Sequence, residues 1–307
     1  MKYYIGVDGG STKTIIAIST ENGIPIKKIT RSGCSYQSIG INASIHMLNK
    51  EIRNLLETLD IKIEDCVGCC IGMPCYGENV YIDKVIEDNI AGVLSPIPVH
   101  VVNDVEVGWA GSLECQEGIH INAGTGSIVF GRGKDKVSAR CGGWHEFYGD
   151  EGSCYWIGRQ AMGLFSKQAD DRIPKGALYE IIRKQLGLIN DFYFTDVVRE
   201  NWIPYRWKVA EFQMYAYEAY KAGDMSVKVL YEDAAQELAS MVKTIKEKLN
   251  FSSEKINVSY SGGLFNTEEL ILEPLSKEIE ILGCTLKEPI HTATEGALLL
   301  SIEKFKK

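Results

Sequence analysis

Alternating apolar runs and glycine-rich turns predict two β-hairpins that lie far apart in the chain. The first turn is Asp8–Lys13 and the second is Gly124–Ser127. Short apolar runs on both sides of a glycine-containing turn are typical of hairpins. The flanking runs are residues 3–7, 14–18, 119–123 and 128–131. Because consecutive amides of such turns can surround an anion, the repetition predicts a duplicated domain that grips one polyphosphate from both sides.

The rest of the first half alternates between helical and strand patterns. Apolar residues at helical spacing predict a helix over 45–59, and the apolar run Val67–Ile71 predicts a buried strand that ends near 72–74. Another strand, over Val99–Val102, ends at Asn103-Asp104, where a helix is expected to begin. Strands that alternate with helices favour an α/β fold, in which helices cover a sheet.

The second half departs from this pattern after its hairpin. A loop over Cys141–Gly152 leads into a helix from about Ser153, and residues 174–249 are predicted to be mostly helical. The aromatic-rich stretch 205–220 is expected to be core or subunit interface. A late strand over 256–260 is followed by Ser261-Gly262-Gly263.

Charge and composition narrow the range of partners. The 307 residues carry a net charge of −8, from 33 basic and 41 acidic side chains, and no basic stripe is visible. Nucleic acids and anionic membranes are therefore not expected as partners. No targeting segment and no apolar run of about 20 residues is present, which predicts a cytoplasmic protein. An odd count of nine cysteines argues against a disulfide framework.

A cluster of cysteines invites a zinc hypothesis, because Cys66, Cys69, Cys70 and Cys75 include C-x-x-C spacing. However, Cys69 and Cys70 lie inside the apolar run that predicts a strand. Two residues three positions apart in a strand point to opposite faces. We therefore expect reduced, metal-free thiols, with zinc as the less favoured alternative. The pair His145-Glu146 does not complete the H-E-x-x-H motif of zinc proteases.

Four polar loops follow predicted strands: Asp8–Lys13, Asn103-Asp104, Gly124–Ser127 and Ser261–Gly263. Ligands of α/β folds bind at the carboxyl ends of strands, so these loops are expected to converge on one cleft. The P-loop string is absent, and both glycine turns lead into strands, which excludes a dinucleotide fingerprint. Each carboxylate also has a structural alternative, since Asp8 could be a turn residue, and Asp104 or Asp150 a helix N-cap.

The combined motifs resemble a known superfamily. Gly6–Thr14, Gly124–Ser127 and Ser261–Gly263 occur in the order found in the actin/hexokinase/heat-shock ATPases. Cys141–Trp144, followed by Gly149–Ser153, is similar to the N-acetylglucosamine kinases of the BadF/BadG/BcrA/BcrD ATPase family. Within it, the chain looks close to bacterial kinases for N-acetylglucosamine and N-acetylmuramic acid. The resemblance implies an α/β fold of duplicated ribonuclease-H-like (actin-like ATPase) domains with an interdomain cleft.

The resemblance also implies a domain organisation. Residues 1–115 would form an N-terminal actin-like ATPase domain, joined by a C-terminal helix at 290–307. Residues 116–289 would form a C-terminal domain of the same kind with a helical insertion. A homodimer is implied as well.

The resemblance assigns roles to individual residues. Asp104 would be the general base that accepts the proton of the sugar's primary hydroxyl, and Asp8 would hold Mg²⁺ through water. Asp150 would accept hydrogen bonds from ring hydroxyls, and Trp144 would shape the pocket. The residues implied to bind ATP are Gly9, Gly10, Ser11, Thr12, Lys13, Gly124, Thr125, Gly126, Ser127, Ser261, Gly262 and Gly263. Those implied to bind the amino sugar are Ser35, Gly72, Met73, Asn103, Asp104, Thr125, Gly143, Trp144, Asp150 and Cys154.

The sequence thus predicts an ATP-dependent kinase for the 6-hydroxyl of an N-acylated amino sugar, N-acetylglucosamine first and N-acetylmuramic acid as a further substrate. Departures from the family pattern at 35–37, 72–74 and Cys154 leave the sugar open, with glucosamine as an alternative. A second alternative is the ATPase activase of a 2-hydroxyacyl-CoA dehydratase. Its cluster cysteine precedes the second glycine loop, where this chain has Ile121-Asn122-Ala123. A non-catalytic sugar sensor is the third.

Overall fold

The computed structural model describes residues 1–306, which divide into two compact units. The first unit combines residues 1–116 with residues 288–306, and the second unit comprises residues 117–287. The chain therefore leaves the first unit once and returns to it for its last helix.

The first unit is built on a mixed sheet of five strands. In spatial order these are β3 (Pro25–Ser32), β2 (Lys13–Ser19), β1 (Tyr3–Gly9), β4 (Cys66–Met73) and β5 (Val99–Asn103). The first three are antiparallel neighbours, whereas β1, β4 and β5 run parallel. The first predicted hairpin is thus confirmed as β1–β2. The parallel arrangement brings the carboxyl ends of β1, β4 and β5 to one edge.

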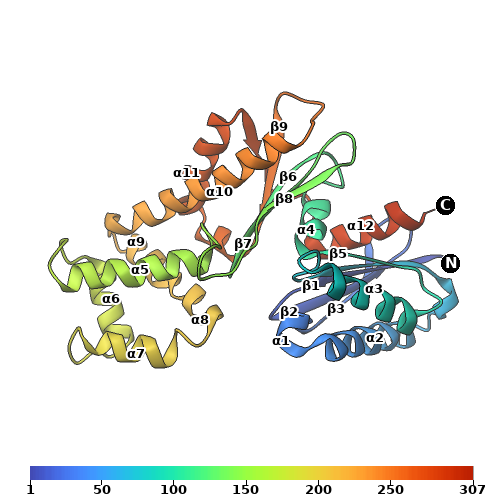
Figure 1. Cartoon of the computed structure of the whole chain (residues 1–307), viewed down its shortest axis with the longest axis horizontal. Helices are drawn as coiled ribbons and strands as arrows, with labels where there is room; N and C mark the ends of the chain where they lie inside the picture. The colour runs from blue at the N-terminus through green and yellow to red at the C-terminus, as the bar shows by residue number, and fades with distance from the viewer. Residues whose placement is uncertain (307) are drawn as a thin grey trace. The chain divides into compact units, whose positions relative to one another are not determined.

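Helices cover both faces of this sheet (Figure 1). They are α1 (Tyr36–Ile39), α2 (Ile41–Thr58), α3 (Val80–Leu94), α4 (Asp104–Ser112) and α12 (Ala293–Phe305), with a 3₁₀ turn at Ile63–Asp65. Successive side chains of β1 point to opposite faces of the sheet, so different residues of the strand pack against the helices on each face. Ile5 and Val7 join the core that contains Ile52 of α2. Gly6 faces α12, where a Cβ atom would lie 2.6 Å from the backbone nitrogen of Leu298.

The second unit repeats the topology of the first. Its sheet has the order β8 (Ser138–Gly142), β7 (Ser127–Arg132), β6 (Gly118–Ala123), β9 (Ile256–Ser261) and β10 (Cys284–Leu286). Here too the first three strands are antiparallel neighbours and the last two continue in parallel. Two sheets with the same strand order establish the duplicated α/β architecture that the two hairpins predict.

The region between β8 and β9 is helical, as the periodicity predicts (Figure 1). Its helices are α5 (Cys154–Ala169), α6 (Ala177–Gln185), α7 (Tyr193–Asn201), α8 (Arg206–Glu211), α9 (Gln213–Lys221) and α10 (Lys228–Lys248), with a 3₁₀ turn at Met225–Val227. A second 3₁₀ turn at Gly263–Thr267 and α11 (Glu269–Ile281) follow β9. Aromatic packing holds the helices together, since the rings of Phe165 and Phe194 lie 4.4 Å apart and Phe212 is fully buried.

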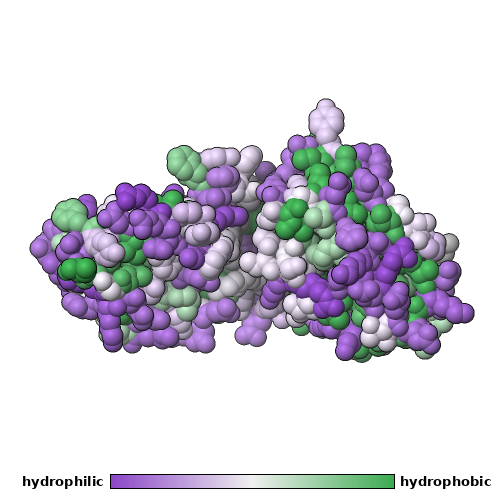
Figure 2. Space-filling view, turned by 90° about the horizontal axis from the view of Figure 1, so that it is seen from below, coloured by the Kyte–Doolittle hydropathy of each residue, from purple (hydrophilic) through white to green (hydrophobic). Residues whose placement is uncertain are grey.

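The face shown in Figure 2 is largely hydrophilic, and its hydrophobic residues lie in small groups. Within residues 1–306, none of the helices is long and apolar enough to cross a membrane.

The cysteines are free thiols, and most are buried. Cys69 and Cys70 lie in β4, where burial raises the pKa of both thiols. In the described part of the chain, no group of three or more His, Cys, Asp and Glu side chains is arranged to hold a metal ion. Cys66, Cys69 and Cys70, which include the C-x-x-C spacing, lie within β4.

Candidate active site

Two carboxylates lie at the carboxyl edge of the first sheet. Asp8, near the end of β1, is in register with Gly72 of β4, and Gly72 is in register with Val102 of β5. Asp104 follows directly after β5 as the first residue of α4. The strand order therefore brings two acidic residues, 96 positions apart in the numbering, to one edge of the sheet.

Burial makes both carboxyl groups harder to ionise, and the charge of Asp8 adds to this effect at Asp104. Burial raises the pKa of Asp8 to about 6, against the opposing effects of Lys13 and a hydrogen bond from Thr294. Burial, followed by the charge of Asp8, raises the pKa of Asp104 to about 7. A divalent cation would relieve this repulsion, and Mg²⁺ prefers oxygen ligands of this kind. The donor set at this edge thus fits the metal that the resemblance implies.

Asp104 does not serve as the cap of α4. The N-cap is Asn103, whose Oδ1 accepts a hydrogen bond from the backbone N–H of Val105 at 3.1 Å. The Nδ2 atom of Asn103 donates to the carbonyl of Tyr76 at 2.7 Å. The capping alternative for Asp104 therefore fails. Asn103, predicted to bind sugar, uses its side-chain amide to hold the start of the helix.

The first glycine turn is tightly built and leaves its tip exposed. A Cβ atom on Gly9 would lie 2.6 Å from the sulfur of Cys34, and the backbone N–H of Cys34 donates to the carbonyl of Gly10 at 3.0 Å. Ser11, Thr12 and Lys13 are exposed at the tip. The exposed tip thus carries two short hydroxyl side chains, Ser11 and Thr12, and the cation of Lys13.

The second turn is held by the segments that follow it. The backbone N–H of Gly124 donates to the carbonyl of Gly126 at 2.9 Å, and that of Cys154 donates to the carbonyl of Gly124 at 2.9 Å. Ser261–Gly263 lies against it, because Gly262 (φ +109°) has no room for a Cβ atom next to the carbonyl of Ala123. The structure therefore brings the second and third predicted ATP segments together within one unit.

Asp150 is buried beside this turn, with 2% of its surface exposed. Its Oδ1 accepts a hydrogen bond from the backbone N–H of Ser127 at 3.2 Å, and its Oδ2 accepts one from Arg206. The capping alternative fails here as well, because the cap of α5 is Ser153, whose Oγ accepts from the N–H of Trp156 at 3.1 Å. Asp150 is held instead by the turn and by a cation.

The sugar-site residues predicted around Asp150 differ in how accessible they are. Trp144 is 68% exposed, so its ring is available to a ligand. Gly143 has φ +72°, a left-handed conformation that favours glycine. Thr125 is exposed at the tip of the turn, whereas Cys154 is buried, and burial raises the pKa of its thiol to about 12.

The sugar-site residues predicted in the first unit are mostly enclosed. Ser35 and Met73 are buried, and the Met73 side chain lies in the core, 3.9 Å from the hydroxyl of Ser44. A Cβ atom on Gly72 would lie 2.6 Å from Cγ2 of Val107. The small residue at 72 is therefore explained by close packing between β4 and α4, and the Met73 side chain does not line an open site.

Sequence reasoning missed two side chains that contact predicted site residues. Arg206 forms ion pairs with Asp150 and with Glu146. Thr294 donates a hydrogen bond from its hydroxyl to Oδ2 of Asp8 at 3.4 Å. Neither belongs to a recognisable motif, and both are brought in by tertiary packing. The only sequence feature that points to Arg206 is its position between two aromatic residues, Tyr205 and Trp207.

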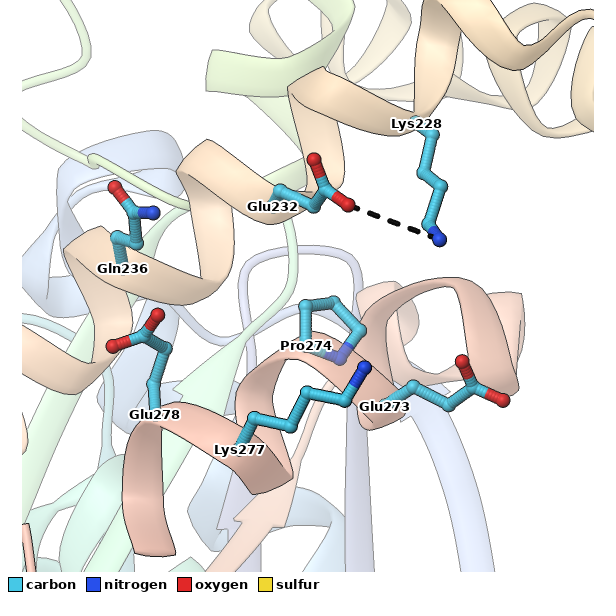
Figure 3. A pocket seen from close by; sticks show the side chains of 7 residues that line it. All are labelled: Lys228, Glu232, Gln236, Glu273, Pro274, Lys277 and Glu278. Carbon is cyan, nitrogen blue, oxygen red and sulfur yellow. Dashed lines mark ion pairs between the residues drawn. The ribbon is translucent and has the colours of Figure 1, made fainter. Parts of the chain in front are cut away.

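A surface groove in the second unit is unrelated to these residues (Figure 3). It lies between α10 and α11, has a volume of about 190 Å³, and contains an ion pair between Lys228 and Glu232 at 3.8 Å. Its lining residues are Lys228, Glu232, Gln236, Glu273, Pro274, Lys277 and Glu278. None of them is a predicted site residue.

Comparison with known proteins identifies the family and its fold. The model of the BadF/BadG/BcrA/BcrD ATPase family matches residues 5–301, which include both glycine turns and both edge carboxylates. The chain belongs to this ATPase family. The match confirms the family and the actin-like ATPase fold that the motifs predict.

Two relatives align along nearly the whole chain. An N-acetylmuramic acid/N-acetylglucosamine kinase of Clostridium acetobutylicum is 32% identical over 288 residues, covering 92% of this chain and 91% of the relative. An N-acetyl-D-glucosamine kinase of Dictyostelium discoideum is 28% identical over 325 residues, covering 99% and 98%.

Solved structures show the same fold. A candidate N-acetylglucosamine kinase from Chromobacterium violaceum superimposes with a TM-score of 0.75 at 21% identity, over 98% of this chain and 99% of that one. A ROK family glucokinase from Streptomyces griseus, solved with glucose and AMPPNP, gives a TM-score of 0.61 at 15% identity, over 98% and 99%.

Proposed function

We propose that this protein is an ATP-dependent kinase that transfers the γ-phosphate to the 6-hydroxyl of an N-acylated amino sugar. The observation that carries the proposal is the pair Asp8 and Asp104 at one sheet edge, in a chain with two relatives named as amino-sugar kinases. N-acetylglucosamine is the first substrate and N-acetylmuramic acid the second. Among residues 1–306, no feature of the structure favours the activase or the sensor over this function.

Asp104 is the proposed general base. Its pKa of about 7 suits the task, because a base works best when its pKa is close to the working pH. Its carboxylate would take the proton from the primary hydroxyl as that oxygen attacks the γ-phosphorus. Since Asn103 supplies the cap of α4, the carboxylate of Asp104 is not needed for that purpose.

Asp8 is the proposed ligand of Mg²⁺, bound through water. The metal, when bound, would neutralise negative charge on the phosphates of ATP. Thr294 keeps one oxygen of the Asp8 carboxylate in place by its hydrogen bond.

The glycine turns are proposed to hold the nucleotide. Gly9–Lys13 and the tip of the second turn, Thr125-Gly126, would offer backbone N–H groups to phosphate oxygens, and Ser261–Gly263 would border the adenosine. Phosphoryl transfer needs mainly positioning and charge neutralisation, which such turns supply.

The sugar contacts are proposed for the loop that contains Trp144 and Asp150. Asp150 has both oxygens in use, but each carboxylate oxygen has a second lone pair for a ring hydroxyl. The exposed Trp144 ring offers an apolar surface for an acetyl group.

A substrate panel tests the proposal. ADP release would be followed with glucose, glucosamine, N-acetylglucosamine and N-acetylmuramic acid, with and without Mg²⁺. We expect kcat/KM for N-acetylglucosamine to exceed that for glucose by roughly 10²-fold. Equal values for the two sugars, or no ADP release with any sugar, would refute it. A homodimer and a cytoplasmic location remain predictions, and light scattering of the purified protein tests the first.

A further inference from the structure

Arg206 joins two carboxylates of the loop 144–150. Its Nη2 atom donates to Oδ2 of Asp150, and its Nε atom lies 3.4 Å from Oε2 of Glu146. The arginine begins α8, in the helical region, and is 56 positions away from Asp150 in the sequence. Because a guanidinium presents its donors in a rigid fork, it can fix two carboxylates at once.

The same ion pair lies directly against the second glycine turn. A Cβ atom on Gly126 would be 2.6 Å from Nη2 of Arg206 and 2.6 Å from Oδ1 of Asp150. Oδ1 of Asp150 also accepts the hydrogen bond of the Ser127 backbone N–H, and the Ser127 hydroxyl donates to the carbonyl of Glu151 at 2.7 Å. The absence of a side chain at 126 thus lets cation, carboxylate and turn meet at one point.

The charged form of the buried Asp150 depends on the positive charge of Arg206. Burial raises the pKa of its carboxyl, Arg206 lowers it, and Glu146 raises it. Its backbone is left-handed, with φ +57°, which a non-glycine residue adopts at some cost. A buried carboxylate in a strained position keeps its orientation only where its surroundings fix it, and removal of the partner leaves an uncompensated charge.

We propose that Arg206 is the positioning residue of the sugar site: it orients Asp150 and fixes the loop 144–150 against the Gly124–Ser127 turn. The inference rests on the proposed function for its link to the sugar. Through it, the helical region controls recognition of the amino sugar without touching the reacting atoms. Lysine, with a single compact charge, would hold one of the two carboxylates and not both.

Three variants test this role: Arg206→Met, Arg206→Lys and the control Lys208→Met. Lys208 is a cation of the same helix that lies over the ring of Tyr205 at 4.7 Å, so its loss changes the charge of α8 equally. We expect Arg206→Met to raise the KM for the sugar roughly 10- to 100-fold, because small displacements of a positioning group have effects of this size. The KM for ATP should change less than the KM for the sugar, since main-chain hydrogen bonds also hold the turn.

Arg206→Lys should give an intermediate sugar KM, and Lys208→Met should resemble wild type. An Arg206→Met enzyme whose sugar and ATP KM values both match those of Lys208→Met would overturn the inference.

Amide hydrogen exchange provides a readout without any substrate. We expect faster exchange in the segment 143–152 in Arg206→Met than in Lys208→Met, because the loop has lost its cation. Unchanged exchange there would overturn the inference even if the kinetics changed. A wild-type protein that is inactive with every sugar would refute the proposed function, while the exchange experiment would still decide the role of Arg206.

Discussion

Thr294, at the start of the last helix, donates a hydrogen bond to Asp8, at the end of the first strand. The two residues are 286 positions apart, and the Thr294 side chain is buried. The return of the chain to its first unit therefore supplies a partner for the carboxylate proposed to hold Mg²⁺. The contact gives the C-terminal helix a part in the site as well as in the core.

This contact predicts how Thr294→Val will behave. Valine keeps the shape but cannot donate, so Asp8 loses one interaction that favours its charged form. We expect the Mg²⁺ concentration for half-maximal activity to rise about fivefold, the equivalent of one net hydrogen bond of about 1 kcal/mol. Thr294→Ser, which retains the hydroxyl, should stay near the wild-type value. A normal Mg²⁺ requirement in Thr294→Val would argue against metal binding at Asp8.

Asp104→Asn separates catalysis from helix capping. Asparagine cannot accept the proton, so we expect kcat to fall roughly 10²- to 10⁴-fold, the range typical of a removed general base. The helix start should persist because its cap is Asn103, and binding of ATP should change little.

Asn103→Ala is the variant to compare with Asp104→Asn. It removes the cap and the hydrogen bond to Tyr76, and we expect it to lower the free energy of unfolding by about 1–2 kcal/mol. Urea titrations and kcat values for both variants check the pair. A folded Asp104→Asn enzyme with near-normal kcat would remove Asp104 from the mechanism.

The edge carboxyls also predict a pH dependence of stability. The pKa values of Asp8 and Asp104 are raised to about 6 and about 7, above those of the unfolded chain. Between about pH 4 and pH 7 the folded state therefore binds more protons, and this contribution to stability is lost as pH rises through the folded pKa values.

We expect Asp104→Asn, measured with a chelator present, to lose less stability than wild type between pH 5 and pH 8. Mg²⁺ should reduce this difference between the two proteins, since it favours the ionised carboxylates of wild type. Chemical denaturation at pH 5 and at pH 8 measures how much the free energy of unfolding of each protein changes. The same change in both proteins would contradict a raised pKa at Asp104.

The sequence was sufficient for the parts of the site that depend on local pattern. The hairpin turns at Asp8–Lys13 and Gly124–Ser127 could be predicted because alternation and glycine act over a few residues. Asp104 could be placed because parallel strands bring their carboxyl ends to one edge.

Contacts between distant segments could not be predicted in this way. The pairs Asp150–Arg206 and Asp8–Thr294 depend on how helices pack, and no spacing in a single sequence encodes that packing. For the cap of α4, the sequence-based prediction names only Asp104 as a structural alternative, although the preceding Asn103 is an equally good N-cap residue. The structure shows that Asn103 is the cap.

Gly72 is predicted to bind the sugar, but close packing against Val107 also explains why the residue is glycine. A Cβ atom there would lie 2.6 Å from Cγ2 and 3.0 Å from Cγ1 of Val107. We therefore expect Gly72→Ala to lower the free energy of unfolding by about 1–3 kcal/mol, the usual cost of overpacking a core. Gly92→Ala is the control, because nothing lies within 4 Å of its added methyl in helix α3, and it should stabilise by up to about 1 kcal/mol.

The double variant Gly72→Ala/Val107→Ala decides between packing and sugar recognition. Val107→Ala removes the two methyl groups that the new Cβ would meet, so part of the stability lost in Gly72→Ala should return in the double variant. If packing is the reason for glycine at 72, kcat/KM should fall by the same factor for N-acetylglucosamine and N-acetylmuramic acid. Additive losses of stability, together with a selective loss of activity on N-acetylmuramic acid, would instead place Gly72 beside the 3-substituent of the sugar.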